Sequence, residues 1–160
     1  MQLIDLPLFW MIGIDFAAWF IIHVTASLLT LYLPDRFFLR DNWLYHCYGW
    51  EKSGRIWQTR FRVKAWKEYL PDGAAIVGRG FVKKHLSEKN TAFLSQFVIE
   101  SRRAEMSHWI TIFPSVLFFL WNPFLAGCLM IVYAVIVNVP CIIAQRYNRP
   151  RLQRILAAKG

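Results

Sequence analysis

The longest uncharged stretch of the sequence constrains the fold most. From Trp109 to Gln145 the chain contains no aspartate, glutamate, lysine or arginine. Pro123, in the turn-like sequence WNPF, divides this stretch, because the residue before a proline disfavours the helical conformation. We therefore predict a helical hairpin whose second arm, residues 125–144, is long enough to cross a bilayer. The first arm, residues 109–121, is too short to span alone, so it either re-enters the membrane or begins earlier, in the preceding polar sequence.

A second apolar segment lies near the N-terminus. Residues 8–33 are typical of one membrane helix, and residues 1–33 contain no lysine or arginine and only two acids, Asp5 and Asp15. The segment has no positive N-terminal region and no small-residue cleavage site, so we expect it to be retained as an anchor. Together with the hairpin it predicts an all-α integral membrane protein with three hydrophobic membrane segments. The hydrophobic content of 56% fits this class.

The positive charges are confined to two regions. All 19 lysines and arginines lie within residues 36–103 or residues 146–159. A hairpin returns the chain to the side that it left, so both regions share one face of the membrane, and the positive-inside tendency makes that face cytoplasmic. The net charge of +9 indicates attraction to anionic lipid headgroups rather than to nucleic acid.

The predicted organisation is a single membrane domain, residues 1–160. Its parts are the N-terminal helix (8–33), an interfacial cytoplasmic segment (34–98), the hairpin with its polar entrance (99–145) and a basic cytoplasmic tail (146–160).

Within the interfacial segment, residues 53–73 predict an amphipathic helix lying on the membrane surface. One face of such a helix carries the apolar side chains Ile56, Val63, Trp66 and Leu70. A basic stripe lies beside it, formed by Arg60, Lys64 and Lys67. The stripe can bind a phosphate-bearing donor, or it can simply adhere to anionic lipid.

The polar entrance to the hairpin, IESRRAEMSHWI, is the candidate catalytic site. One helical face carries Glu100, Arg103 and His108, and Glu105 stands three residues before His108. Exposing these charges to lipid is costly, so we expect them to face protein or water. An imidazole oriented by Glu105 or Glu100 suits general-base activation of a hydroxyl, and Arg103 can hold a phosphate or an oxyanion. A ring of paired interfacial charges without catalytic function explains the same residues equally well.

Two other kinds of site fit less well. Glu105 and His108 have the spacing of the Glu-x-x-His ligands in di-iron bundles, but such a site needs a second set, and none of the other three histidines lies in that context. We therefore predict no metal and no cofactor. His46 and Glu51 have the H-x4-E spacing of glycerolipid acyltransferases, a short pattern that arises easily by chance.

The basic tail follows the last apolar segment directly. Arg146, Arg149 and Arg151 surround Tyr147 and Asn148. If the hairpin forms as predicted, these residues emerge at the level of its polar entrance. They either recognise a phosphate or a sugar, or they form a collar that stops membrane transfer.

Several of these stretches resemble the CrtO family, the glycosyl-4,4'-diaponeurosporenoate acyltransferases of staphylococcal-type carotenoid synthesis. The matching sequences are LPDRFF, EKSGRIW, VKAWK, IESRRAEMSHWI and NVPCIIAQRYNRPRL, and the resemblance extends from about residue 33 onward. It implies a bacterial cell-membrane enzyme that esterifies a fatty acyl group onto the glucose C6 hydroxyl of a glycosylated C30 carotenoid acid, the closing step toward staphyloxanthin. It also places His85 and the basic tail within family motifs.

The residues and the resemblance together predict a membrane acyltransferase with His108 as the base. We expect an acyl thioester donor such as acyl-CoA, whose phosphates suit the basic face; a phospholipid donor also fits. The predicted substrate-binding residues are Arg103, His85, Gln145, Arg146, Asn148, Arg149 and Arg151. The alternatives are a non-catalytic lipid-binding or assembly protein, and an acyltransferase that acts on another glycolipid.

Overall fold

The computed structural model describes residues 4–70 and 91–158, and all regular elements in these two ranges are helices. The chain divides into two compact units. Unit 1 comprises Met1–Leu33 and Met106–Pro140, and unit 2 comprises Pro34–Glu105 and Cys141–Gly160.

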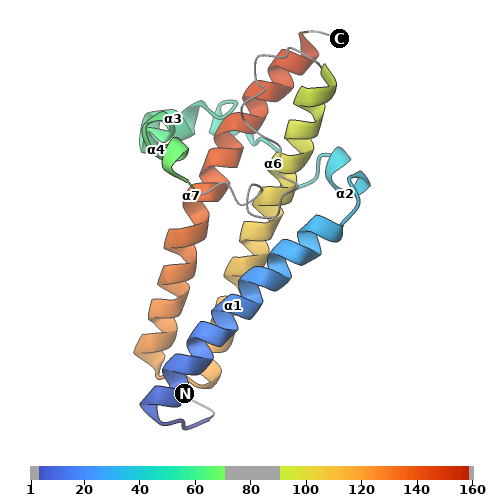
Figure 1. Ribbon diagram of the computed structural model, residues 1–160. Coiled ribbons are helices and arrows are strands. Elements are labelled where there is room, and N and C mark those ends of the chain that lie inside the picture. The colour runs from blue at the N-terminus through green and yellow to red at the C-terminus, as the bar shows by residue number, and fades with distance from the viewer. Residues whose placement is uncertain (1–3, 71–90, 159–160) are drawn as a thin grey trace. The chain divides into compact units, whose positions relative to one another are not determined.

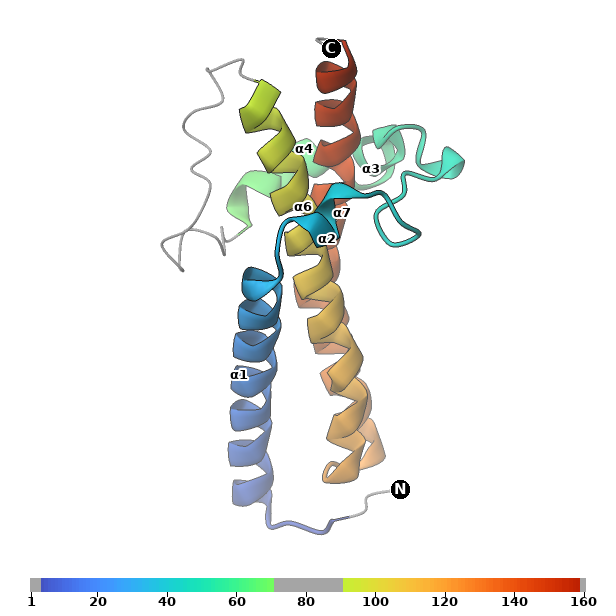
Figure 2. The same ribbon diagram turned by 90° about the vertical axis from the view of Figure 1, so that its right-hand side faces the viewer.

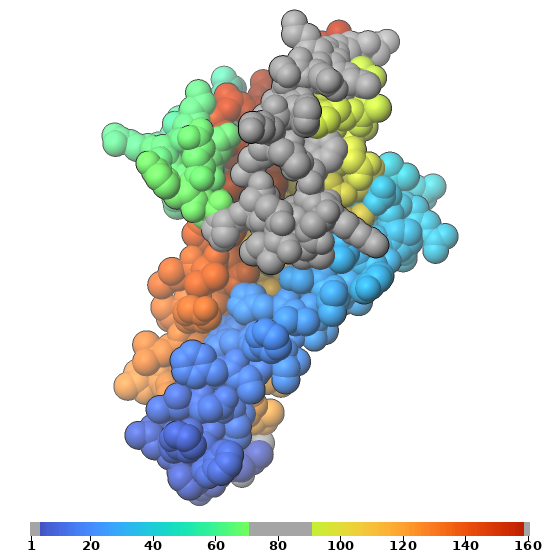
Figure 3. Space-filling view, in the orientation of Figure 1, coloured from blue at the N-terminus to red at the C-terminus, as the bar shows by residue number. Residues whose placement is uncertain are grey.

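Unit 1 contains the N-terminal helix α1 (Leu8–Tyr32), which confirms the predicted helix to within one residue. Prolines flank this helix, because Pro7 precedes its first turn and Pro34 restricts the residue before it. Many large apolar side chains of α1 are exposed, among them Phe9, Phe16 and Phe20, and Figure 3 shows the helix along the surface in blue. By length and composition α1 can cross a membrane.

The hairpin has a longer first arm than its apolar sequence suggests. Helix α6 (Thr91–Ile112) begins inside the polar sequence and continues as the 3-10 helix η4 (Phe113–Leu120). Pro114 accounts for the change of helix type, since it cannot donate a backbone hydrogen bond. Helix α7 (Phe124–Ala157) follows the predicted turn. The helix of this arm thus begins earlier than the apolar sequence, as one of the two alternatives predicted.

Two helices in the described ranges, α1 and α7, are long and apolar enough to cross a membrane. A third membrane segment therefore stays a prediction. Helix α7 does not stop at the end of the predicted second arm but runs through the basic tail to Ala157. It does so although Pro140 and Pro150 each remove a backbone donor from the helix.

A buried carboxylate in α1 holds the hairpin turn of unit 1. Asp15, only 8% exposed, accepts hydrogen bonds from Trp121 Nε1 at 2.7 Å and from Asn122 Nδ2 at 2.8 Å. Further along α1, the Trp19 ring stacks on Phe118 with the centroids 4.8 Å apart. An acid inside an apolar helix is costly unless it is paired, so the two donors explain how Asp15 is accommodated.

Unit 2 places the short helices of the central segment around the unit 2 parts of α6 and α7, which run side by side in Figures 1 and 2. These short helices are α2 (Arg36–Leu39), η1 (Gly49–Glu51), α3 (Arg55–Phe61), α4 (Val63–Trp66) and η2 (Lys67–Tyr69). 

The predicted single helix over residues 53–73 is interrupted at Arg62, whose φ is +48°. Side chains satisfy the backbone groups that the break frees: Gln58 Oε1 accepts from the Lys64 N–H at 3.0 Å, and Trp66 Nε1 donates to the Phe61 carbonyl at 2.6 Å. The break also buries Val63 completely. A continuous helix was therefore the wrong prediction for the described part of this segment.

Gly54 allows a close approach within unit 2 that a larger residue cannot make. Its φ is +82°, and a Cβ atom there would lie 3.1 Å from the Arg146 carbonyl oxygen and 3.2 Å from that of Tyr147.

Gly54→Ala should therefore lower the free energy of unfolding by about 1–3 kcal/mol. The measurement is thermal unfolding of the protein in detergent. Gly49→Ala is the matched control, since its Cβ would meet nothing within 4 Å. Equal midpoints for the two variants would contradict this explanation.

Candidate active site

Unit 2 contains a buried cluster of four charged side chains, which we call the ionic cluster: Glu51, Glu105, Arg146 and Arg149. Glu105 is fully buried, and its two carboxylate oxygens lie 2.7 Å from Arg146 Nε and 2.6 Å from Arg149 Nη1. Arg146 Nη1 also lies 2.7 Å from Glu51 Oε1, and Glu51 Oε2 accepts from Trp57 Nε1 at 2.9 Å. The two negative and two positive charges balance, which makes burial of the cluster tolerable.

The two arginines of the ionic cluster use their remaining donors on the backbone. Arg146 Nη2 donates to the Leu44 carbonyl at 2.5 Å, and Arg149 Nη2 donates to the Tyr45 carbonyl at 3.1 Å. These contacts fasten the loop before η1 to α7. The cluster is therefore a structural centre of unit 2, in which side chains from α6, α7 and the central segment meet.

Glu100 and Arg103, predicted to share a helical face, do form a pair. Arg103 Nε lies 3.2 Å from Glu100 Oε2, and Arg103 Nη2 lies 2.5 Å from Asp35 Oδ1. Gln96 Nε2 donates to the other oxygen of Glu100 at 3.0 Å. Both side chains are thus engaged with protein groups on α6 and at the start of α2.

His108 lies in unit 1, and its partner there is an amide rather than a carboxylate. Its Nδ1 is 2.8 Å from Asn138 Oδ1, and Asn138 Nδ2 donates to the Ala134 carbonyl at 2.9 Å. Because the amide nitrogen is engaged with Ala134, its oxygen faces the ring, and Nδ1 must be the atom that carries the proton. The lone pair of Nε2 has no hydrogen-bond partner among the described residues. His108 is therefore held in the tautomer that a general base needs.

Two of the other predicted binding residues contact neighbours on unit 2. Asn148 Oδ1 accepts a hydrogen bond from Lys67 Nζ at 3.0 Å. Arg151 is exposed, and its guanidinium carbon lies 4.5 Å from the centroid of the Tyr147 ring, whose hydroxyl it also contacts. The Arg151 guanidinium is accordingly more accessible to a substrate than those of the ionic cluster.

The remaining sequence candidates are spread over the chain. His85 lies outside the described residues, and Gln145 is half-buried on α7. His46 Nδ1 lies 3.1 Å from Asp41 Oδ2, whereas Glu51 belongs to the ionic cluster. In the part of the chain that the structure describes, no hydrogen bond or ion pair joins His46 to Glu51, so the H-x4-E pattern does not form a pair.

Sequence reasoning did not single out Asn138 as a partner of His108. A signal was available, because Asn138 is a polar residue inside an otherwise apolar segment and is 2% exposed. Such residues face protein rather than lipid. Glu51 was noted only for its spacing from His46, and nothing local in the sequence indicates its pairing with Arg146.

The fold and the site define a class: an all-helical protein, in its described residues, with two helices suited to a membrane and an imidazole in a fixed tautomer. Comparison with known proteins identifies the family. The CrtO family, described as glycosyl-4,4'-diaponeurosporenoate acyltransferase, matches residues 41–158. The chain belongs to this family and is an acyltransferase.

Two curated relatives illustrate the similarity. The glycosyl-4,4'-diaponeurosporenoate acyltransferase of Staphylococcus aureus strain Newman is 39% identical over 145 residues, which cover 89% of this chain and 87% of the relative. The enzyme of the same name from strain USA300 is 38% identical over 138 residues, which cover 86% of this chain and 83% of the relative. No solved structure matches the chain.

Proposed function

We propose that this protein transfers a fatty acyl group from a thioester donor to the C6 hydroxyl of the glucose on a glycosylated C30 carotenoid acid. The names of the relatives, which are similar over more than four-fifths of their length, support the acceptor class. The observation that carries the chemistry is the hydrogen bond that fixes His108 with Nε2 free to accept a proton. We place the enzyme in the bacterial cell membrane as a multi-pass protein with a cytoplasmic basic face.

In the proposed reaction, His108 Nε2 takes the proton from the sugar hydroxyl as its oxygen attacks the thioester carbonyl. The new C–O ester bond forms and the C–S bond breaks. The imidazolium then returns the proton to the departing sulfur, so the products are the ester and a free thiol. No proton is gained or lost overall, and His108 ends in its initial state.

Asn138 is the orienting residue in this proposal, in place of Glu105 or Glu100. A neutral amide accepts from Nδ1 and fixes the ring without adding a negative charge that favours the imidazolium. Glu105 already serves two arginines, and Glu100 pairs with Arg103.

The arginines have different functions in this proposal. Arg146 and Arg149 are neutralised within the ionic cluster, so they maintain unit 2 rather than bind substrate. Arg151 has an exposed guanidinium, so it can contact a sugar or a phosphate directly.

Asn138 variants test the orienting function. Asn138→Ala should reduce kcat about 10- to 100-fold, a part of the effect of general-base catalysis. Asn138→Asp retains an acceptor for Nδ1 and should recover much of this loss, while its negative charge should move the acidic limb of the pH–rate profile to higher pH. The measurement is turnover of a glycosylated carotenoid acid across pH. A purely structural function for Asn138 predicts no shift of the profile, and that result would refute this assignment.

A further inference from the structure

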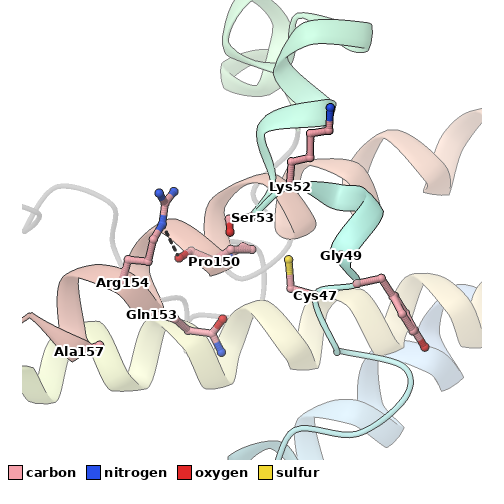
Figure 4. A pocket seen from close by; sticks show the side chains of 9 residues that line it. Cys47, Gly49, Lys52, Ser53, Pro150, Gln153, Arg154 and Ala157 are labelled. Atoms are coloured by element: carbon pink, nitrogen blue, oxygen red, sulfur yellow. Dashed lines mark hydrogen bonds between the residues drawn. The ribbon is translucent and has the colours of Figure 1, made fainter.

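A pocket of about 390 Å³ lies in unit 2 between the η1 region and the end of α7, and none of the four ionic-cluster residues lines it. Figure 4 shows Cys47 and Ser53 near the middle of its lining, with Arg154 on one side and Lys52 on the other. The lining residues include two cations and no carboxylate. This composition attracts an anion.

The two cations differ from Arg103 and from the arginines of the ionic cluster. Arg103, Arg146 and Arg149 are all paired with carboxylates. No described carboxylate pairs with Lys52, and the hydrogen bond of Arg154 is a long one from Nε to the Pro150 carbonyl, 3.4 Å. The Nη groups of Arg154 and the ammonium of Lys52 therefore keep their donors for a ligand.

The backbone holds this side of the pocket in an uncommon shape. Lys52 and Ser53 both adopt left-handed conformations, with φ of +50° and +56°. Non-glycine residues rarely do so, and two in succession indicate that the surrounding structure imposes the turn. Gly54, which follows this turn in the sequence, packs against the α7 backbone and so holds the turn in place.

The one thiol in the lining is unsuited to covalent chemistry. Burial raises the pKa of the Cys47 thiol, and the nearby Glu51 carboxylate raises it further. A protonated thiol is a poor nucleophile, so we do not expect an acyl-enzyme at Cys47. The pocket is better suited to holding a ligand by charge and hydrogen bonds.

We propose that this pocket binds the phosphate group of the acyl donor, with Lys52 and Arg154 supplying the positive charge and the Ser53 hydroxyl a hydrogen bond. The proposal rests on the proposed function, which requires a donor. It moves donor recognition from the paired arginines of α6 and α7 to two cations that pair with no carboxylate among the described residues. The shared chemistry is a phosphate ester, and the donor that carries it is either a coenzyme A thioester or an anionic phospholipid.

The test is calorimetric titration of free coenzyme A into the full-length protein in phosphatidylcholine nanodiscs. Lys52→Gln combined with Arg154→Gln should weaken binding about tenfold or more, because two charge-assisted contacts are lost. Arg36→Gln, at an exposed cation of α2 outside the pocket lining, should remain within about twofold of the wild type. Raising the salt concentration should weaken wild-type binding more than that of the double variant.

A second arm of the experiment separates the two sources of phosphate. It measures how much phosphatidylglycerol the protein retains from mixed-lipid nanodiscs. Dependence on Lys52 and Arg154 in the coenzyme A arm identifies a thioester donor, and dependence in the phosphatidylglycerol arm alone identifies a phospholipid; either result supports the phosphate site. If the double variant matches Arg36→Gln in both arms while retaining the wild-type unfolding midpoint, the proposal is overturned.

The failure of this proposal is distinguishable from the failure of the proposed function. If the wild type forms the ester and the double variant has an unchanged KM for the donor, the pocket assignment is wrong and the reaction stands. If the wild type forms no ester, the reaction is wrong, and the binding data alone decide whether the pocket recognises phosphate.

Discussion

Replacing Glu105 with glutamine should lower the free energy of unfolding by about 3–5 kcal/mol, the cost of breaking a buried ion pair. The carboxylate is fully buried and is shared by Arg146 and Arg149. Its removal leaves two guanidinium groups with the single carboxylate of Glu51, and the excess positive charge stays buried. The measurement is thermal unfolding of the detergent-solubilised protein.

Two further variants make this result specific. Glu100→Gln breaks a pair whose carboxylate side chain is 35% exposed and should cost less than about 1 kcal/mol. Combining Glu105→Gln with Arg149→Gln restores charge balance, so the double variant should recover part of the loss of the single one. If Glu105→Gln and Glu100→Gln unfold at the same temperature, the ionic cluster is not the structural centre of unit 2.

His108→Ala should reduce kcat about 100- to 10,000-fold, the usual contribution of a positioned general base, with little change in the unfolding midpoint. The reason is that Nε2 is the atom proposed to take the proton from the sugar hydroxyl. His46→Ala is the control, because His46 pairs with Asp41 at an exposed position. The rate is measured with donor and acceptor at saturation. Equal turnover by the two variants would exclude His108 as the base and leave the chemistry to another group.

The parts of the fold that the sequence predicts well are those set by local rules. Prolines and apolar length define α1 between Pro7 and Pro34, and they define the turn at residues 121–123. The pairing of Glu100 with Arg103 also follows from their helical spacing.

The features of the fold and the site that the sequence does not predict depend on contacts between residues that are distant in the sequence. Arg146 meets Glu105 and Glu51 across 41 and 95 positions, and no local pattern indicates such pairing. The break at Arg62 likewise depends on the burial of Val63 and on side chains that cap the freed backbone. Helical spacing and the cost of exposing charges to lipid located the motif with His108, but only the structure shows that its partner is Asn138.

The ionic cluster explains why the basic tail is helical rather than a free extension. Arg146 and Arg149 lie one turn apart on α7, and both bind Glu105 on α6. Their charges are neutralised by carboxylates within the protein. A count of arginines therefore overstates the positive charge available to lipid or substrate. The charge available to an anion lies at exposed positions such as Lys52 and Arg154.

The most direct test of the central claim is mass spectrometry of pigment extracts from cells that make a glycosylated C30 carotenoid acid, with and without this protein. We expect a new species heavier by one fatty acyl group when the protein is present, and its loss with His108→Ala at equal expression. An unchanged pigment mass in cells with well-expressed wild-type protein would contradict transfer to this acceptor, and an ester that persists with His108→Ala would contradict the mechanism.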